Sequence, residues 1–185
     1  MRKATGRSKR VALLRGINVG TAKRIAMADL RSLIEDLGFQ GVRTLLGSGN
    51  VVFSGAKNGA GSEAGRIETA IKKRLGVTTR VTVLTGKEVL AAVRENPLGS
   101  VADNPSRLLL MVLRDARTAA RLRPLLKSDW TPESIALRGR VAYLWCANGI
   151  IDSRLSASVG RVIGDSGTAR NLATMTKLAS MVESE

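Results

Sequence analysis

The chain has 185 residues, of which 44% are hydrophobic and 24% charged, and its formal net charge is +15. That apolar content is enough for one large domain or two small ones. The longest apolar run, residues 108–113, is far shorter than the roughly 18 residues of a membrane span. The first apolar segment, residues 11–14, is too short for a signal peptide. We therefore expect a soluble, unexported, cytoplasmic protein with no membrane partner.

Histidine is absent from the chain, and Cys146 is its only cysteine. This composition excludes Ser-His-Asp and Cys-His catalysis, an intrachain disulfide and a structural zinc site. No cluster of aspartates with calcium-loop spacing is present either. We predict that the protein uses no metal and no cofactor. Cys146 lies in a strand-like segment, where we expect it to act as a small buried hydrophobic residue.

The first half of the chain follows a β-α-β-β-α-β pattern after a basic tail. The tail holds Arg2, Lys3, Arg7, Lys9 and Arg10. The expected elements are a strand at 11–17, a helix at 27–37, strands at 42–46 and 50–54, a helix at 62–75 and a strand at 77–84. This order predicts a ferredoxin-like antiparallel sheet with two helices on one face.

A second cycle of elements follows a third helix, which begins with a capping-box pattern from Thr85 to Glu88. The expected elements are a strand at 108–113, a helix capped by Asp115, strands at 133–137 and 141–146, and two closing helices. The apolar face of the first closing helix is Leu155, Val159, Val162 and Ile163, and that of the second is Leu172, Met175, Leu178 and Val182. The order is β-α-β-β-α-α, which resembles the first half without its last strand. The predicted fold class is therefore α+β with two related subdomains.

We therefore expect four segments along the chain. They are a basic N-terminal tail (1–10), a ferredoxin-like subdomain (11–96), a linker rich in proline, glycine and serine (97–106), and a second α+β subdomain (107–185).

The first candidate binding segment is the loop after the first strand, residues 14–20. Two glycines bracket a turn that contains Arg15 and Asn18, with Lys23 and Arg24 just beyond it. Exposed backbone N–H groups beside a guanidinium group form an anion-binding site in many proteins. The alternative is a tight strand-to-helix connection with a solvated arginine.

The second segment is Gly47-Ser-Gly-Asn50, which opens a strand. Glycines beside a strand indicate a bulge or a close backbone approach. In a split βαβ sheet the first and third strands are central neighbours, so Ser48 and Asn50 are expected near Arg15. The alternative is that these residues only make the hairpin.

The third segment is residues 167–177, which we interpret as part of a helix. At helical spacing Arg170, Thr174 and Lys177 share one face. Arg170 and Asn171 lie in the predicted first turn, where the helix dipole favours an anion. The alternative is an ordinary solvated basic face.

Four motifs are informative together: Arg15-Gly-Ile-Asn-Val-Gly20, Ser48-Gly-Asn-Val-Val-Phe53, Asn148-Gly-Ile-Ile-Asp-Ser-Arg-Leu155, and Thr168-Ala-Arg-Asn171 with Thr176-Lys-Leu178. They resemble the motifs of the bacterial domain-of-unknown-function family 1697. The resemblance runs from about Val11 to Ala179 and implies two α+β subdomains with ferredoxin-like character. It implies no particular activity. The chain departs from the family pattern at Leu172 and Ala173, where tryptophan and asparagine are usual, and at Gly47, where glutamine is common.

The sequence is compatible with three functions. The favoured one is a binding module in which seven residues converge in a basic cleft between the subdomains on an anionic small molecule or nucleotide. Those residues are Arg15, Asn18, Ser48, Asn50, Arg170, Asn171 and Lys177. The second is a phosphoryl or acyl-phosphate hydrolase, by fold-level analogy, with Arg15 clamping the phosphoryl group and Asn50 orienting water. The third is non-specific nucleic-acid binding, which the charge favours and the low aromatic content does not.

Overall fold

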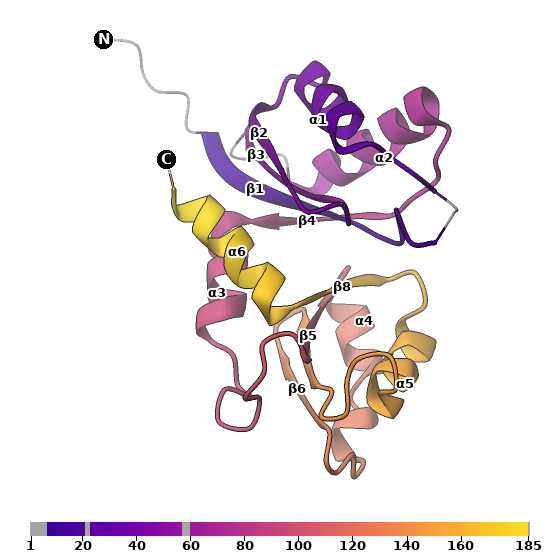
Figure 1. The fold of residues 1–185 in the computed structure, drawn as a ribbon, viewed down its shortest axis with the longest axis vertical. Coiled ribbons are helices and arrows are strands. Elements are labelled where there is room, and N and C mark those ends of the chain that lie inside the picture. Colours follow the sequence, from indigo (N-terminus) through magenta and orange to yellow (C-terminus); the bar gives the residue numbers. More distant parts are fainter. Residues whose placement is uncertain (1–6, 21–22, 57–59, 185) are drawn as a thin grey trace. The chain divides into compact units, whose positions relative to one another are not determined.

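The computed structural model describes residues 7–20, 23–56 and 60–184 (Figure 1). The chain forms two compact units, which we call the N-terminal unit (Met1–Val89 with Leu178–Glu185) and the C-terminal unit (Leu90–Lys177). The division falls inside two helices, α3 (Gly86–Arg94) and α6 (Leu172–Glu183).

The N-terminal unit has the predicted ferredoxin-like arrangement. Its elements are β1 (Arg7–Leu14), α1 (Met27–Asp36), β2 (Gln40–Leu45), β3 (Asn50–Ala56), α2 (Ala60–Leu75) and β4 (Val81–Thr85), followed by α3. The strand order is β2-β3-β1-β4, and all neighbouring strands are antiparallel. Helices α1 and α2 lie on the same side of this sheet (Figure 1).

Side chains along β1 point alternately to the two faces of the sheet, and both faces are buried. Ala12 and Leu14 point into a core formed with apolar residues of α1 and α2, such as Leu33 and Ile67. Successive side chains on a strand point to opposite faces. Val11 and Leu13 therefore face the other side, and both are also fully buried.

Part of α6 lies against the helix-free face of this sheet. The Arg43 guanidinium on β2 donates a hydrogen bond to the Met181 carbonyl at 2.5 Å. A Cβ atom added to Gly86 would lie 2.7 Å from Val182 Cγ1, so only glycine permits this close approach. The C-terminal end of the chain thus completes the N-terminal unit.

Strand β1 begins at Arg7, four residues before the predicted start at Val11. Residues 7–10 of the expected basic tail therefore pair with β3, with Arg10 opposite Phe53. Residues 1–6 lie outside the described residues. The early start was missed because residues 7–10 are polar and carry no apolar signal of their own.

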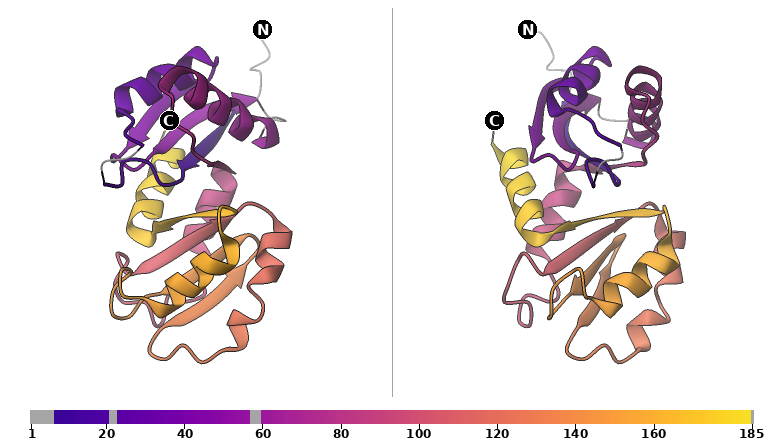
Figure 2. Two further views of the ribbon diagram at one scale, coloured as in Figure 1. Left: turned by 90° about the vertical axis from the view of Figure 1, so that its right-hand side faces the viewer. Right: turned by 45° about the vertical axis from the view of Figure 1, so that its right-hand side comes forward.

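The C-terminal unit repeats the architecture. Its elements are β5 (Leu108–Leu113), α4 (Ala116–Arg121), a 3₁₀ turn (Leu125–Lys127), β6 (Ser134–Arg138), β7 (Val141–Trp145), α5 (Arg154–Ile163) and β8 (Gly167–Asn171), followed by α6. The strand order is β6-β7-β5-β8, again antiparallel throughout. Figure 2 shows β8 leading directly into α6.

Strand β8 corrects the prediction that this unit lacks a last strand. The segment Gly167-Thr-Ala-Arg-Asn171 was interpreted as helical because Arg170, Thr174 and Lys177 have helical spacing. In the structure the helix begins only at Leu172. Pairing with the fully buried strand β5 decides the conformation of residues 167–171, because tertiary context overrides weak local preference.

The two sheets also match in register. Leu14 lies opposite Val81 in the first sheet, and Leu113 lies opposite Gly167 in the second. Four residues earlier on β1 and β5, Arg10 lies opposite Thr85 and Leu109 lies opposite Asn171. Both units are therefore βαββαβ units followed by one further helix. Among the described residues, no helix has the length and apolar character needed to cross a membrane.

Candidate functional site

The loop between β1 and α1 is held firmly at its first residue. The Arg15 N–H donates to the Arg80 carbonyl at 2.9 Å, and the Thr79 hydroxyl donates to the Arg15 carbonyl at 2.8 Å. Both bonds tie the loop to the residues that precede β4. The Arg15 side chain is half-buried. The backbone position of Arg15 is thus determined by the sheet rather than by the loop alone.

Positive φ angles alternate along the same loop. They occur at Gly16 (62°), Asn18 (55°) and Gly20 (63°), with residues of negative φ between them. Such alternation turns successive backbone N–H groups toward one side, which forms an anion-binding concavity. Within the part of the chain that the structure describes, the N–H groups of Gly16, Val19 and Gly20 have no hydrogen-bond acceptor. All three residues are exposed.

Asn18 stabilises the loop. Its side-chain Nδ2 donates to the Ile25 carbonyl at 2.9 Å and to the Gly47 carbonyl at 2.6 Å. Its Oδ1 accepts the Ile25 N–H at 2.8 Å. One amide therefore closes the β1–α1 loop and joins it to the β2–β3 turn. The prediction that Asn18 binds a ligand stays a prediction; its side chain hydrogen-bonds to the backbone of the loop that presents the N–H groups.

The β2–β3 turn packs directly against the end of β1, as the strand order predicts. The Leu14 N–H donates to the Gly49 carbonyl at 2.9 Å. Gly49 has a φ of 76°, and a Cβ atom there would lie 2.7 Å from both Leu14 Cβ and Ile17 Cδ1. Glycine is required for this contact. The Ser48 side chain on the same turn is exposed.

Asn50 begins β3 and is fully buried. Its Nδ2 donates to the Leu45 carbonyl at 2.9 Å and to the Ser48 hydroxyl at 3.0 Å. The amide thus stabilises the turn from inside. Sequence reasoning placed Asn50 correctly beside the loop, but the spacing alone does not tell whether an amide faces a ligand or its own backbone.

The charge around this loop is predominantly positive. Lys23 and Arg24 are exposed, and the Arg24 guanidinium donates to the Gly20 carbonyl at 3.2 Å. Arg80 Nη1 lies 3.6 Å from Glu68 Oε2, which offsets one of these charges. An anion bound at the loop would be attracted by these neighbouring positive charges, and salt would weaken the attraction.

The other three predicted residues lie in the C-terminal unit. Arg170 is on β8, where its guanidinium donates to the Ala169 carbonyl at 2.7 Å and to the Thr168 hydroxyl at 3.1 Å. Burial lowers the pKa of Arg170 to about 10. The Asn171 Oδ1 accepts the Thr174 N–H at 2.9 Å, so this side chain caps α6. Lys177 is exposed on α6. Arg170 therefore does not share a helix face with Lys177, and the convergence of all seven residues stays a prediction.

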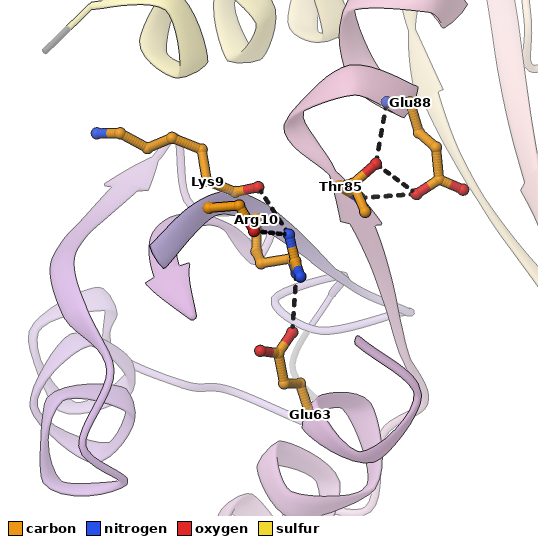
Figure 3. Close-up of polar contacts among 6 residues, drawn as sticks. Lys9, Arg10, Glu63, Thr85 and Glu88 are labelled. Carbon is orange, nitrogen blue, oxygen red and sulfur yellow. Dashed lines mark hydrogen bonds and ion pairs between the residues drawn. The ribbon is translucent and has the colours of Figure 1, made fainter. Parts of the chain in front are cut away.

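Arg10 and Glu63 form a buried ion pair that the sequence analysis did not predict (Figure 3). Arg10 Nε lies 3.3 Å from Glu63 Oε2, and the two side chains are 3% and 2% exposed. Burial raises the pKa of Glu63, although the Arg10 charge opposes this shift. Gly55 makes room for the pair, since a Cβ atom there would overlap Glu63 Oε1. The available signal was the alternation of Arg10 with Ala12 and Leu14, which places Arg10 on the core face of β1.

An open groove lies on the surface of the N-terminal unit between the end of α1 and α2. Its volume is about 430 Å³, and it is lined by Leu37, Gly65, Arg66, Thr69, Ala70 and Lys73. The Arg66 guanidinium already donates to the Leu37 carbonyl at 2.8 Å and lies 5.0 Å from the Phe39 ring centroid. None of the predicted site residues lines this groove.

Cys146 is fully buried, as predicted, and burial raises the pKa of its thiol. A raised pKa disfavours the thiolate, which is the reactive form. No group of three or more histidine, cysteine, aspartate or glutamate side chains within residues 7–20, 23–56 and 60–184 is arranged to hold a metal ion.

The architecture defines a protein of two ferredoxin-like units, each with an antiparallel four-stranded sheet. The chain belongs to the family described as "Protein of unknown function (DUF1697)", whose model matches residues 8–143. This is the family that the sequence motifs indicate.

A solved structure with a similar fold is that of the conserved bacterial protein SP0830 from Streptococcus pneumoniae. The TM-score is 0.74 at 17% sequence identity, with 96% of this chain and 100% of that chain covered. At this identity the likeness concerns the fold alone. No curated protein matches the chain.

Proposed function

We propose that the N-terminal unit binds an anionic small molecule or nucleotide at what we call the loop site, residues 15–20 and 47–50. The observation that carries the proposal is the alternation of positive φ angles, which leaves the exposed N–H groups of Gly16, Val19 and Gly20 without an acceptor among the described residues. Backbone N–H groups arranged in this way recur in proteins as phosphate sites.

The roles within the loop site differ. Arg15 supplies positive charge next to the N–H groups and is the residue we assign to the anion. Asn18 and Asn50 position the two loops, because their amides hydrogen-bond to backbone carbonyls. A hydrogen bond to a charged group contributes about 1.5–3 kcal/mol, so Arg15 is expected to account for much of the affinity.

The two alternative functions have less support. A hydrolase of the acylphosphatase type needs Asn50 to orient water, yet its side chain is fully buried and donates to Leu45 and Ser48. Sequence-tolerant binding of single-stranded nucleic acid favours exposed aromatic side chains on which bases stack. Phe53 and Tyr143 are 0% and 1% exposed, and Trp145 is 8% exposed. Binding of a small anion is therefore the better-supported proposal.

The test is calorimetric titration of the full chain with phosphate, pyrophosphate and adenosine 5′-monophosphate at low ionic strength. We expect at least one anion to bind, and Arg15→Ala to weaken it about tenfold or more. Arg121→Ala is the matched control, because it removes the same charge from an exposed position on α4 of the C-terminal unit. Absence of binding to all three anions, or equal losses in the two variants, would contradict the proposal.

A further inference from the structure

Two exposed aliphatic side chains accompany the loop site. Val19 is 73% exposed in the β1–α1 loop, and Leu46 is 54% exposed at the start of the β2–β3 turn. Single exposed aliphatic residues are ordinary on protein surfaces. These two are unusual in their positions, because Asn18 and Gly47, their chain neighbours, are joined by a hydrogen bond of 2.6 Å.

Leu46 is also in a backbone conformation that leucine rarely adopts. Its φ is 58°, in the left-handed region that glycine occupies without steric penalty. In the corresponding hairpin of the C-terminal unit, between β6 and β7, the residue with positive φ is Gly139 at 54°. The N-terminal unit therefore carries a strained, exposed leucine where its structural counterpart uses glycine. Strain of this kind clusters at binding and catalytic sites.

Apolar and anion-binding features thus occur on the same two loops. The N–H groups of Gly16, Val19 and Gly20 provide donors, and Val19 and Leu46 provide apolar surface within one residue of the Asn18–Gly47 contact. Inorganic phosphate would use only the donors. A ligand with a phosphate at one end and a flat, weakly polar ring at the other would use both.

We propose that the ligand of the loop site is a nucleoside monophosphate whose base covers Val19 and Leu46 while its phosphate takes the loop N–H groups. This inference rests on the proposed function and specifies its ligand class. Transfer of apolar surface out of water on binding makes affinity depend on the base. The phosphate contribution, by contrast, weakens as ionic strength rises.

The experiment compares inorganic phosphate, ribose 5-phosphate and adenosine 5′-monophosphate by titration calorimetry on the full chain. We expect adenosine 5′-monophosphate to bind about tenfold more tightly than ribose 5-phosphate. Leu46→Gly should remove most of that difference and leave the ribose 5-phosphate affinity unchanged. Glycine relieves the backbone strain at this position, so the variant is expected to fold. Val19→Ala is a second variant that leaves the turn untouched.

The control is Ile151→Gly, which removes a 97% exposed aliphatic side chain from the C-terminal unit. It should leave all three affinities unchanged. Equal binding of ribose 5-phosphate and adenosine 5′-monophosphate would overturn this inference and leave the proposed function intact. So would equal loss in the Leu46→Gly and Ile151→Gly variants. If none of the three ligands binds, both proposals fail.

Discussion

The two units share strand order and register but differ in how the first strand connects to the first helix. In the N-terminal unit residues 15–26 separate β1 from α1. In the C-terminal unit only Arg114 and Asp115 separate β5 from α4, and Asp115 Oδ1 caps the helix by accepting the Thr118 N–H at 2.8 Å. The framework evidently folds with a two-residue connection. The long loop of the N-terminal unit is therefore an addition to the fold, and loops added to a rigid scaffold are where binding residues concentrate.

A second difference lies in the cores of the two sheets. The register places Arg10 of β1 at the position that Leu109 occupies on β5. Arg10 is paired with Glu63 on α2, whereas Leu109 belongs to the apolar core of its unit. At this position one unit thus contains a buried ion pair and the other an apolar side chain. For the loop after the first strand and for the buried ion pair, the C-terminal unit therefore serves as the reference for the N-terminal unit.

The largest difference in the free energy of unfolding is expected between alanine substitutions at two hairpin glycines, Gly49 and Gly139. Gly49→Ala places a Cβ atom 2.7 Å from Leu14 and Ile17 at a φ of 76°, and we expect a loss of about 4 kcal/mol in the free energy of unfolding. Gly139 also has positive φ but nothing within 4 Å of an added Cβ, so Gly139→Ala should cost about 1 kcal/mol. Urea denaturation followed by circular dichroism measures both. Similar losses would mean that the N-terminal hairpin is not packed as described.

The buried ion pair should give the next largest effect. Glu63→Leu removes the carboxylate that faces the buried Arg10 charge, which we expect to cost about 3 kcal/mol. The double variant Arg10→Met with Glu63→Leu makes this core resemble that of the C-terminal unit and should recover most of the loss. Failure of the double variant to recover would contradict the equivalence of Arg10 and Leu109.

The pH dependence of stability provides the control for this pair. Burial raises the pKa of Glu63 above 4.5, so the folded state holds the carboxyl proton more tightly than the unfolded state. The contribution of Glu63 to the free energy of unfolding is therefore greatest below pH 4.5 and falls as the pH rises through the folded-state pKa. Glu63→Gln should abolish this fall, whereas Asp36→Asn, at an exposed position, should not.

The smallest effect concerns the two helices that follow the sheets. Thr85 accepts the Glu88 N–H at 3.2 Å and caps α3, and Asn171, its counterpart in register, caps α6. Thr85→Ala and Asn171→Ala should each cost about 1 kcal/mol. Denaturation measures the loss, and calorimetry should show that Asn171→Ala leaves affinity at the loop site unchanged. A large loss of affinity in Asn171→Ala would indicate that Asn171 contacts the ligand directly.

Most elements of the fold could be predicted because their signals are local. Strand β5 has the bounds that its apolar run predicts, and the Thr85–Glu88 and Asp115 caps form the hydrogen bonds that their spacing indicates. The positions of Arg15 and the glycine loops also followed from strand order, since β1 and β3 are neighbours in any split βαβ sheet.

The residue pattern therefore accounts for the order of the elements, the absence of histidine chemistry and the two glycine loops that meet at one end of a sheet. The strand conformation of residues 167–171 depends on tertiary structure, because their partner β5 lies more than fifty residues earlier in the chain. The tertiary structure alone decided that Arg10 is a core residue and that Asn18 and Asn50 bind backbone carbonyls. In each case the sequence gives the residue type, but the group that the residue pairs with becomes a neighbour only when the chain folds.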